Sequence, residues 1–182
     1  MNIAPLGREA TLEDLYAVEG NAELVDGRIV LMPPTSDDHN TAVGNIFFRL
    51  KLYQREHGGG RPYTDGVGFI LNPRRSCSPD VAWHTGPRSH DKRIQGAPAF
   101  AVEVRSEEDY GPAADRRLEA KRADYFAAGT QVVWDVDVMR EGWIRVYHAA
   151  DPENPSLFRR GEIADAEPAV PGWRFPVDEL FD

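Results

Sequence analysis

Residues 78–83 read Ser-Pro-Asp-Val-Ala-Trp, and residues 100–106 read Phe-Ala-Val-Glu-Val-Arg-Ser. Each run is short and apolar, as expected of a strand, and each carries one carboxylate, Asp80 or Glu103. Acidic residues are depleted in strands and are rarely buried unless they are paired or bind a metal. We therefore expect two strands that present these carboxylates at one shared point.

A helix is predicted over residues 116–128, with Lys121 in its first half and Gly129 just beyond its end. Two converging carboxylates can bind a hard cation such as Mg²⁺, which prefers oxygen ligands. Such an ion polarises a phosphate and lowers the pKa of a bound water. A nearby lysine can orient that water or stabilise negative charge on the phosphate.

The rest of the chain predicts strands interleaved with helices. A short helix should begin at Thr11, a hairpin over residues 22–31 should turn at Asp26-Gly27, and a longer helix should begin after Ser36 or Asp37. Further strands are expected at residues 67–71, 131–136 and 143–147. Turns or loops are expected at residues 72–76, 84–98 and 106–115. An irregular tail at residues 171–176 should precede a Leu180-Phe181 anchor. This order predicts an α/β or α+β fold with a mixed sheet.

The length of 182 residues is typical of one domain, which we expect to span residues 1–182. The formal net charge of −9 argues against attraction of nucleic acid by the whole surface. It leaves room for a local basic groove or a metal-bridged contact, and it suits a site built from carboxylates.

Three features predict a cytoplasmic protein. No apolar run approaches the ~20 residues that cross a bilayer, and residues 1–10 lack the pattern of a secretory signal. The single cysteine, Cys77, excludes an internal disulfide framework and fits a reducing compartment.

The sequence resembles the PD-(D/E)xK nucleases and, more closely, the Uma2 (DUF820) family of that superfamily. The resemblance implies a restriction-endonuclease-like fold, with a central mixed sheet flanked by helices, and Mg²⁺- or Mn²⁺-dependent endonuclease activity, with DNA as the expected substrate. The matching segments follow the family's order along the chain: residues 23–30, Pro34-Thr35 with His39, residues 78–81, residues 102–106, Lys121 with residues 125–129 and 133–134, Pro171-Gly172-Trp173, and Leu180-Phe181.

The resemblance also implies roles for individual residues. Asp80 and Glu103 would bind the metal, with the Val104 carbonyl as a third ligand, and Glu23 would add an acid near the same site. The third position of the (D/E)xK motif is Arg105 rather than lysine, and arginine is a poor substitute for a lysine that orients water. By resemblance, Lys121 supplies the missing ammonium.

Structural explanations stay open for each candidate. Asp80 could cap a turn, Glu103 could pair with an arginine, Lys121 could be a solvated surface residue, and Glu23 could be an exposed strand residue. His39 shares the core-facing stripe of the helix that carries Val43, Ile46, Phe47 and Leu50, so it could be structural or part of the site. The basic pairs Arg74-Arg75, Lys92-Arg93 and Arg116-Arg117 could line a phosphate groove or be ordinary surface.

Two other functions compete with the nuclease. The nuclease fold could serve a binding or regulatory protein without useful turnover, which the net charge and Arg105 favour. A metal-dependent hydrolase of small phosphate esters would instead need a closed pocket at Asp80 and Glu103. For a nuclease that cuts both strands we expect a homodimer, because a two-fold axis supplies a pair of sites.

Overall fold

The computed structural model describes residues 2–3, 8–32, 34–64, 66–91 and 93–182. Its elements, in chain order, are β1 Asn2–Ile3, α1 Leu12–Tyr16, β2 Ala22–Val25, β3 Arg28–Leu31, α2 Asp37–His57, β4 Arg61–Thr64, β5 Gly68–Asn72, β6 Arg75–Cys77, β7 Val81–His84, β8 Arg93–Gln95, β9 Phe100–Val104, α3 Pro112–Ala127, β10 Val132–Asp137, β11 Trp143–His148, β12 Asp151–Arg159, β13 Ile163–Asp165, β14 Arg174–Pro176 and the 3₁₀ helix η1 Val177–Phe181.

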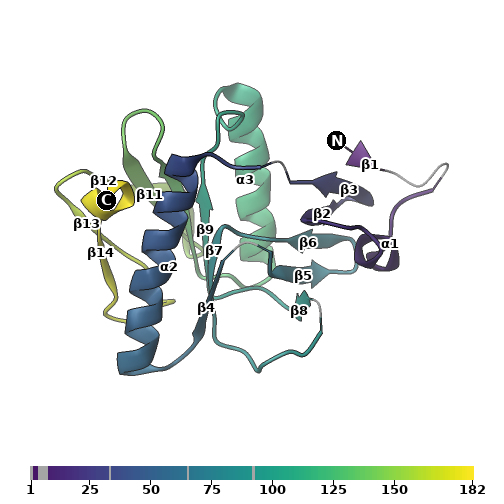
Figure 1. Ribbon diagram of the computed structural model, residues 1–182, viewed down its shortest axis with the longest axis horizontal. Helices are drawn as coiled ribbons and strands as arrows, with labels where there is room; N and C mark the ends of the chain where they lie inside the picture. Colours follow the sequence, from purple (N-terminus) through teal and green to yellow (C-terminus); the bar gives the residue numbers. More distant parts are fainter. Residues whose placement is uncertain (1, 4–7, 33, 65, 92) are drawn as a thin grey trace.

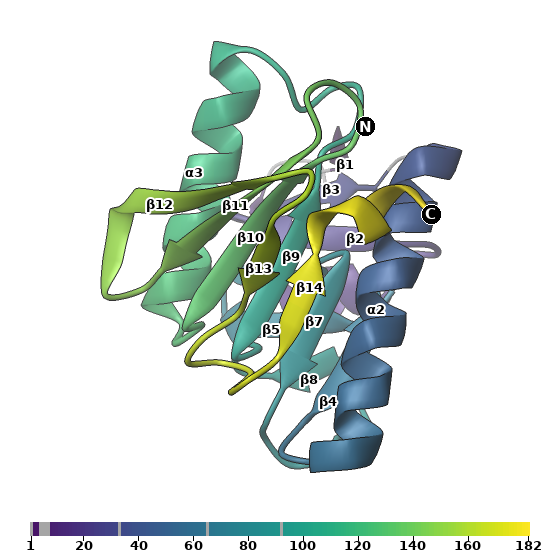
Figure 2. The ribbon, with the colours of Figure 1, turned by 90° about the vertical axis from the view of Figure 1, so that its left-hand side faces the viewer.

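A mixed sheet with the order β12-β11-β10-β9-β7-β4 forms the centre of the molecule. Strand β9 runs parallel to β10 and antiparallel to β7, so the two acid-bearing segments are neighbours. Helix α2 and the C-terminal segment cover one face of this sheet, while α3 and the N-terminal sheet lie against the other (Figures 1 and 2). This layering confirms the predicted mixed sheet flanked by helices.

Burial on both faces explains why the central strands are continuous apolar runs. The side chains of Val102 and Trp134 pack toward α2 and the C-terminal segment, whereas those of Ala101 and Val133 pack against Tyr125 of α3. Successive strand residues point to opposite faces, so each central strand needs apolar side chains at nearly every position. Polar residues within these strands, such as Glu103 and Asp135, therefore need specific partners.

Helix α2 forms as its sequence predicts. The Ser36 hydroxyl accepts a hydrogen bond from the His39 amide and caps the helix, which ends before Gly58 at a φ of +68°. Val43, Ile46 and Leu50 are buried on the central sheet, and Phe47 packs beside them. His39, in the first turn of α2, is also buried, and it contacts Asp80 just before β7.

A second sheet, with the order β1-β3-β2-β6-β5-β8, contains the predicted hairpin. Its turn residues Asp26 and Gly27 both have positive φ, as a two-residue hairpin turn requires. Thr11 caps α1 in a capping box with Asp14, and Leu15 of α1 packs on Ala22 and Leu24 of β2. This sheet brings Glu23 to the side of the central sheet where α3 lies.

Three expectations about element boundaries are wrong. The predicted loop over residues 84–98 contains β8, which forms through parallel pairing with β5 rather than from its own apolar content. The predicted turn at residues 72–76 contains the start of β6. Helix α3 begins at Pro112 instead of Arg116, because proline at the first helical position loses no helical hydrogen bond.

The C-terminal third has more regular structure than expected. Strand β12 is largely exposed, contains Pro152 and Pro155, and pairs on one side with β11, which is where a sheet tolerates proline. The tail expected to be irregular forms β14 and η1, and Trp173, Phe175 and Leu180 anchor it in the core as the predicted Leu180-Phe181 anchor requires.

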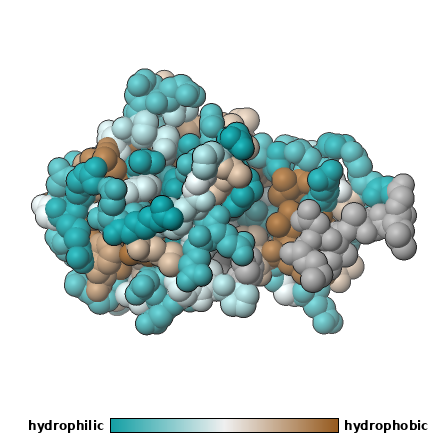
Figure 3. Space-filling view, turned by 90° about the horizontal axis from the view of Figure 1, so that it is seen from above, coloured by the Kyte–Doolittle hydropathy of each residue, from teal (hydrophilic) through white to brown (hydrophobic). Residues whose placement is uncertain are grey.

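The surface is predominantly polar. Figure 3 shows hydrophilic side chains over most of the upper face, with hydrophobic patches toward the N-terminal sheet and at the opposite side of the view. None of the described helices combines the length and hydrophobicity needed to cross a bilayer.

Candidate active site

Strand register brings Asp80 and Glu103 together. Val81 of β7 pairs with Val102 of β9 at the end of an antiparallel ladder. Asp80 lies in the bend just before β7, and Glu103 follows Val102 in β9. The Val104 amide donates a 2.7 Å hydrogen bond to Asp80 Oδ2, which fixes this carboxylate at the end of β9. Asp80 thus precedes its strand instead of lying within it, but the two acids lie near one another, and the charge of Asp80 acts on Glu103.

Helix α3 supplies a lysine and a tyrosine to Glu103. Lys121 Nζ donates to Glu103 Oε2 at 2.8 Å, and the Tyr125 hydroxyl donates to Glu103 Oε1 at 2.6 Å. Lys121 and Tyr125 are four residues apart, so they lie on one face of the helix. Lys121 is therefore not a solvated surface residue.

Glu23 of β2 completes the cluster. Its Oε1 atom lies 3.1 Å from Lys121 Nζ and accepts a 2.7 Å hydrogen bond from the Ser78 amide. Glu23 is buried, so it is not an exposed strand residue. The amine of Lys121 consequently lies between two carboxylates, Glu23 and Glu103.

His39 approaches the cluster from α2. Its Nε2 atom lies 3.4 Å from Asp80 Oδ2, and its side chain is almost fully buried. The imidazole therefore contacts a candidate metal ligand, which places His39 beside the site while leaving its role open.

The protonation equilibria reflect this concentration of buried charge. Burial raises the pKa of Glu103 above its usual value; Lys121 counteracts the rise, and the nearby charges of Asp80 and Glu23 add to it. Burial tends to lower the pKa of Lys121, but Glu103 and Glu23 outweigh it and raise that pKa well above its usual value. Burial also raises the pKa of Tyr125, which keeps its hydroxyl a hydrogen-bond donor.

Arg105 does not take the place of the motif's lysine. Its Nε and Nη2 atoms each donate 2.8 Å hydrogen bonds to the buried carboxylate of Asp135, and its Nη1 atom donates to Asp115 at 3.1 Å. The guanidinium is stacked over Trp143 as well. Arg105 thus ties β9 to β10 and to the first turn of α3, and Glu103 pairs with Lys121 rather than with Arg105.

The donor set fits a hard divalent cation. Asp80 and Glu103 offer carboxylate oxygens, and they keep 15% and 13% of their side-chain surfaces exposed, so solvent can reach them. Within the described ranges, no three His, Cys, Asp or Glu side chains form a group that could hold a metal by themselves. A site with two carboxylates leaves other positions to water and substrate, which is the usual arrangement for Mg²⁺. The Val104 carbonyl stays a predicted ligand; the structure assigns the Val104 amide to Asp80.

Several members of the basic pairs are ion-paired with carboxylates. Arg74 pairs with Glu9, Arg75 pairs with Asp26 and Asp124, and Arg117 lies 3.7 Å from Asp109. Lys92 lies outside the described residues. Arg93 points into a cavity, which is described below.

Sequence reasoning assigned no role to Tyr125 or to the Ser78 amide, both of which bind site carboxylates. The spacing of Lys121 and Tyr125 on one helix face is a signal that could have identified the tyrosine. No residue pattern marks a main-chain donor such as Ser78, because its position depends on how β2 packs beside the segment before β7. The structure buries Trp83, Trp134, Trp143 and Trp173, as expected for core aromatics.

Comparisons with known proteins agree with this architecture. The Uma2 family, described as "Putative restriction endonuclease", matches residues 10–178. A solved structure from Anabaena variabilis, described as "a putative nuclease belonging to DUF820", superimposes with a TM-score of 0.74 at 17% identity, covering 94% of this chain and 97% of that one. A search of curated proteins found none that matches. The restriction-endonuclease-like fold expected from the sequence is confirmed.

Proposed function

Because this chain belongs to the Uma2 family, we propose that it is an endonuclease that uses Mg²⁺ or Mn²⁺ to hydrolyse phosphodiester bonds, with DNA as its substrate. One observation carries the proposal: Lys121 Nζ lies 2.8 Å from Glu103, on the strand that neighbours Asp80. This arrangement supplies two carboxylates and an ammonium at one sheet edge even though the motif's own third position is occupied by Arg105.

Asp80 and Glu103 are the residues that would hold the ion, together with the Val104 carbonyl. When bound, a divalent cation polarises a phosphate and activates a water. Lys121 would stabilise negative charge that develops on the phosphate and help to position the attacking water. Glu23 is a second ion-pair partner of the Lys121 amine, and the Tyr125 hydroxyl and Val104 amide orient the two metal-binding carboxylates.

A polymer fits this site better than a small phosphate ester. Asp80 and Glu103 keep 15% and 13% of their side-chain surfaces exposed to solvent. The carboxylates lie at partly exposed ends of β7 and β9, where an extended strand has access. We also propose a homodimer, which light scattering of the purified protein would test.

The test is cleavage of supercoiled plasmid and of single-stranded DNA with Mg²⁺ or Mn²⁺ by the wild type, Asp80→Ala and Lys121→Ala. We expect cleavage by the wild type and its loss in both variants. Loss in Asp80→Ala alone would retain the metal site and remove Lys121 from the chemistry. A folded wild type that cuts neither substrate would favour a binding or regulatory protein with a nuclease fold.

A further inference from the structure

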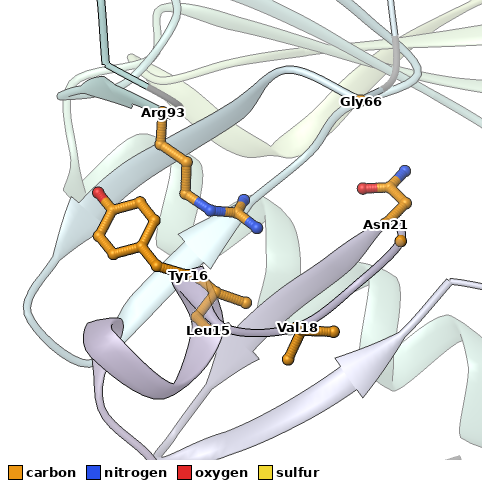
Figure 4. Close-up of a pocket in the computed structure, with 7 residues that line it drawn as sticks. Leu15, Tyr16, Val18, Asn21, Gly66 and Arg93 are labelled. Atoms are coloured by element: carbon orange, nitrogen blue, oxygen red, sulfur yellow. The ribbon is translucent and has the colours of Figure 1, made fainter.

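A cavity of about 290 Å³ lies between α1 and the N-terminal sheet. It is several times larger than the ~30 Å³ that one water occupies. Its walls combine apolar and polar groups, and none of the described residues that line it is acidic. The lining residues are Leu15, Tyr16, Val18, Gly20, Asn21, Gly66 and Arg93. Figure 4 shows the Arg93 guanidinium between the Tyr16 ring and the Asn21 amide.

The sequence makes room for this guanidinium. Arg93 begins β8, which runs parallel to β5, and its side chain crosses the start of β5 at Gly68. A Cβ atom at residue 68 would lie only 1.9 Å from Arg93 Nη1. Any side chain at that position would displace the guanidinium, so Gly68 holds open the path by which Arg93 reaches the cavity.

Arg93 carries a charge that is only partly compensated. Its Nη2 atom donates a 3.0 Å hydrogen bond to the Ala22 carbonyl. Within the part of the chain that the structure describes, Arg93 forms no ion pair with a carboxylate, and burial lowers its pKa. A guanidinium has five N–H donors in a planar fork, which matches the oxygens of a phosphate. A half-buried arginine in a cavity whose described lining holds no acid can therefore receive an anion.

Strand β2 connects this cavity to the active site. Arg93 binds the carbonyl of Ala22, and the next residue, Glu23, lies 3.1 Å from Lys121. Nucleic-acid strands carry a phosphate about every 3.4 Å along the helix axis. A strand bound at Asp80 and Glu103 therefore carries further phosphates close to the one that would react.

We propose that the cavity around Arg93 binds a phosphate group, and that this phosphate belongs to the nucleic-acid strand held at the active site. The part that concerns the strand rests on the proposed function. Arg93 then provides a local cationic contact on a chain whose formal net charge is −9, and Asn21 and Tyr16 add hydrogen-bond donors at the cavity.

The test measures binding without cleavage. The full chain is titrated into a fluorescein-labelled oligonucleotide in EDTA, at several salt concentrations, with anisotropy as the readout. Arg93→Gln removes the charge, and Gly68→Ala retains the arginine but fills the space it needs. Arg28→Gln, at an exposed position on the hairpin, is the control with the same change in charge. Circular dichroism and urea midpoints establish that each variant folds.

We expect Arg93→Gln and Gly68→Ala to weaken oligonucleotide binding about tenfold and to reduce the salt dependence by about one phosphate contact, with little change in Arg28→Gln. A second arm measures the thermal shift produced by thymidine monophosphate. A shift that depends on Arg93, without an effect on oligonucleotide binding, would support a phosphate site that serves a free nucleotide. The proposal is overturned if neither ligand distinguishes the folded variants from the wild type. Cleavage of plasmid by Arg93→Gln at the wild-type rate and affinity would exclude binding of a substrate-strand phosphate at the cavity. The nuclease assignment would remain intact.

Discussion

Lys121 of α3 reaches across to Glu103 of β9 and forms a 2.8 Å ion pair at the end of the central sheet. The same amine lies 3.1 Å from Glu23. Helix α3 thus contributes the ammonium that the motif's third position lacks, and this pair organises the candidate site.

Replacing Lys121 should affect catalysis and stability together. Lys121→Met leaves two buried carboxylates without their cation, which can cost about 3–5 kcal/mol of unfolding free energy, and it removes an electrostatic contact worth about 10²–10³ in rate. The double variant Lys121→Met/Glu103→Gln should regain part of the stability, measured by urea unfolding, but none of the cleavage. Equal stability of the two variants would show that Glu103 does not need the ammonium.

Introducing lysine at the motif position should not restore function. The carboxylate of Asp135 is 2% exposed and binds Arg105 through two hydrogen bonds, a geometry that lysine cannot reproduce. We expect Arg105→Lys to lower the unfolding free energy and to leave the rate of the Lys121→Met background unchanged. Rescue of cleavage in Arg105→Lys/Lys121→Met would contradict the structural role of Arg105.

The substitution Tyr125→Phe removes one hydroxyl group and keeps the aromatic ring. The buried ring keeps its packing on Ala101 and Val133, while the 2.6 Å hydrogen bond to Glu103 is lost. Partners that orient metal-binding carboxylates typically contribute about 10–100-fold to metal affinity or activity. We therefore expect weaker Mn²⁺ binding with a nearly unchanged circular dichroism spectrum. Wild-type affinity in this variant would assign Tyr125 to packing alone.

The stability of the fold should fall in mild acid because of His84. Burial, and then the charge of Arg61, lowers the pKa of His84 in the folded protein, whereas an unfolded histidine titrates near 6.5. Below about pH 6.5 the unfolded state binds more protons, so this group makes stability decrease as the pH falls and adds no pH dependence above that value. Urea midpoints between pH 5 and 8 should fall more steeply for the wild type than for His84→Gln. Parallel curves would exclude His84 as the source.

The fold was predictable where local pattern and tertiary packing agree. The hairpin at Asp26-Gly27, the amphipathic α2 and the apolar strands β9 and β10 all carry their own signal. The sequences of β8 and β12 carry little signal of a strand, because β8 has one buried residue and β12 contains prolines and is largely exposed. These two strands form because they pair with β5 and β11.

In the candidate site, too, some features were predictable from the sequence and others depend on tertiary packing. Asp80 and Glu103 were identifiable because acids are unusual inside apolar runs, and the resemblance identified Lys121 and Glu23. The Arg93 cavity was not identifiable, because it depends on an arginine crossing a glycine of another strand. The partnership of Arg105 with Asp135 likewise depends on the parallel pairing of β9 with β10.

Calorimetric titration of the DNA-free protein with Mn²⁺ tests most directly whether Asp80 and Glu103 form one metal site. We expect a saturable binding isotherm for the wild type and for Glu9→Gln, a control on the exposed surface, and its loss in both Asp80→Asn and Glu103→Gln. A folded wild type that binds no Mn²⁺, or unchanged binding in both site variants, would contradict it.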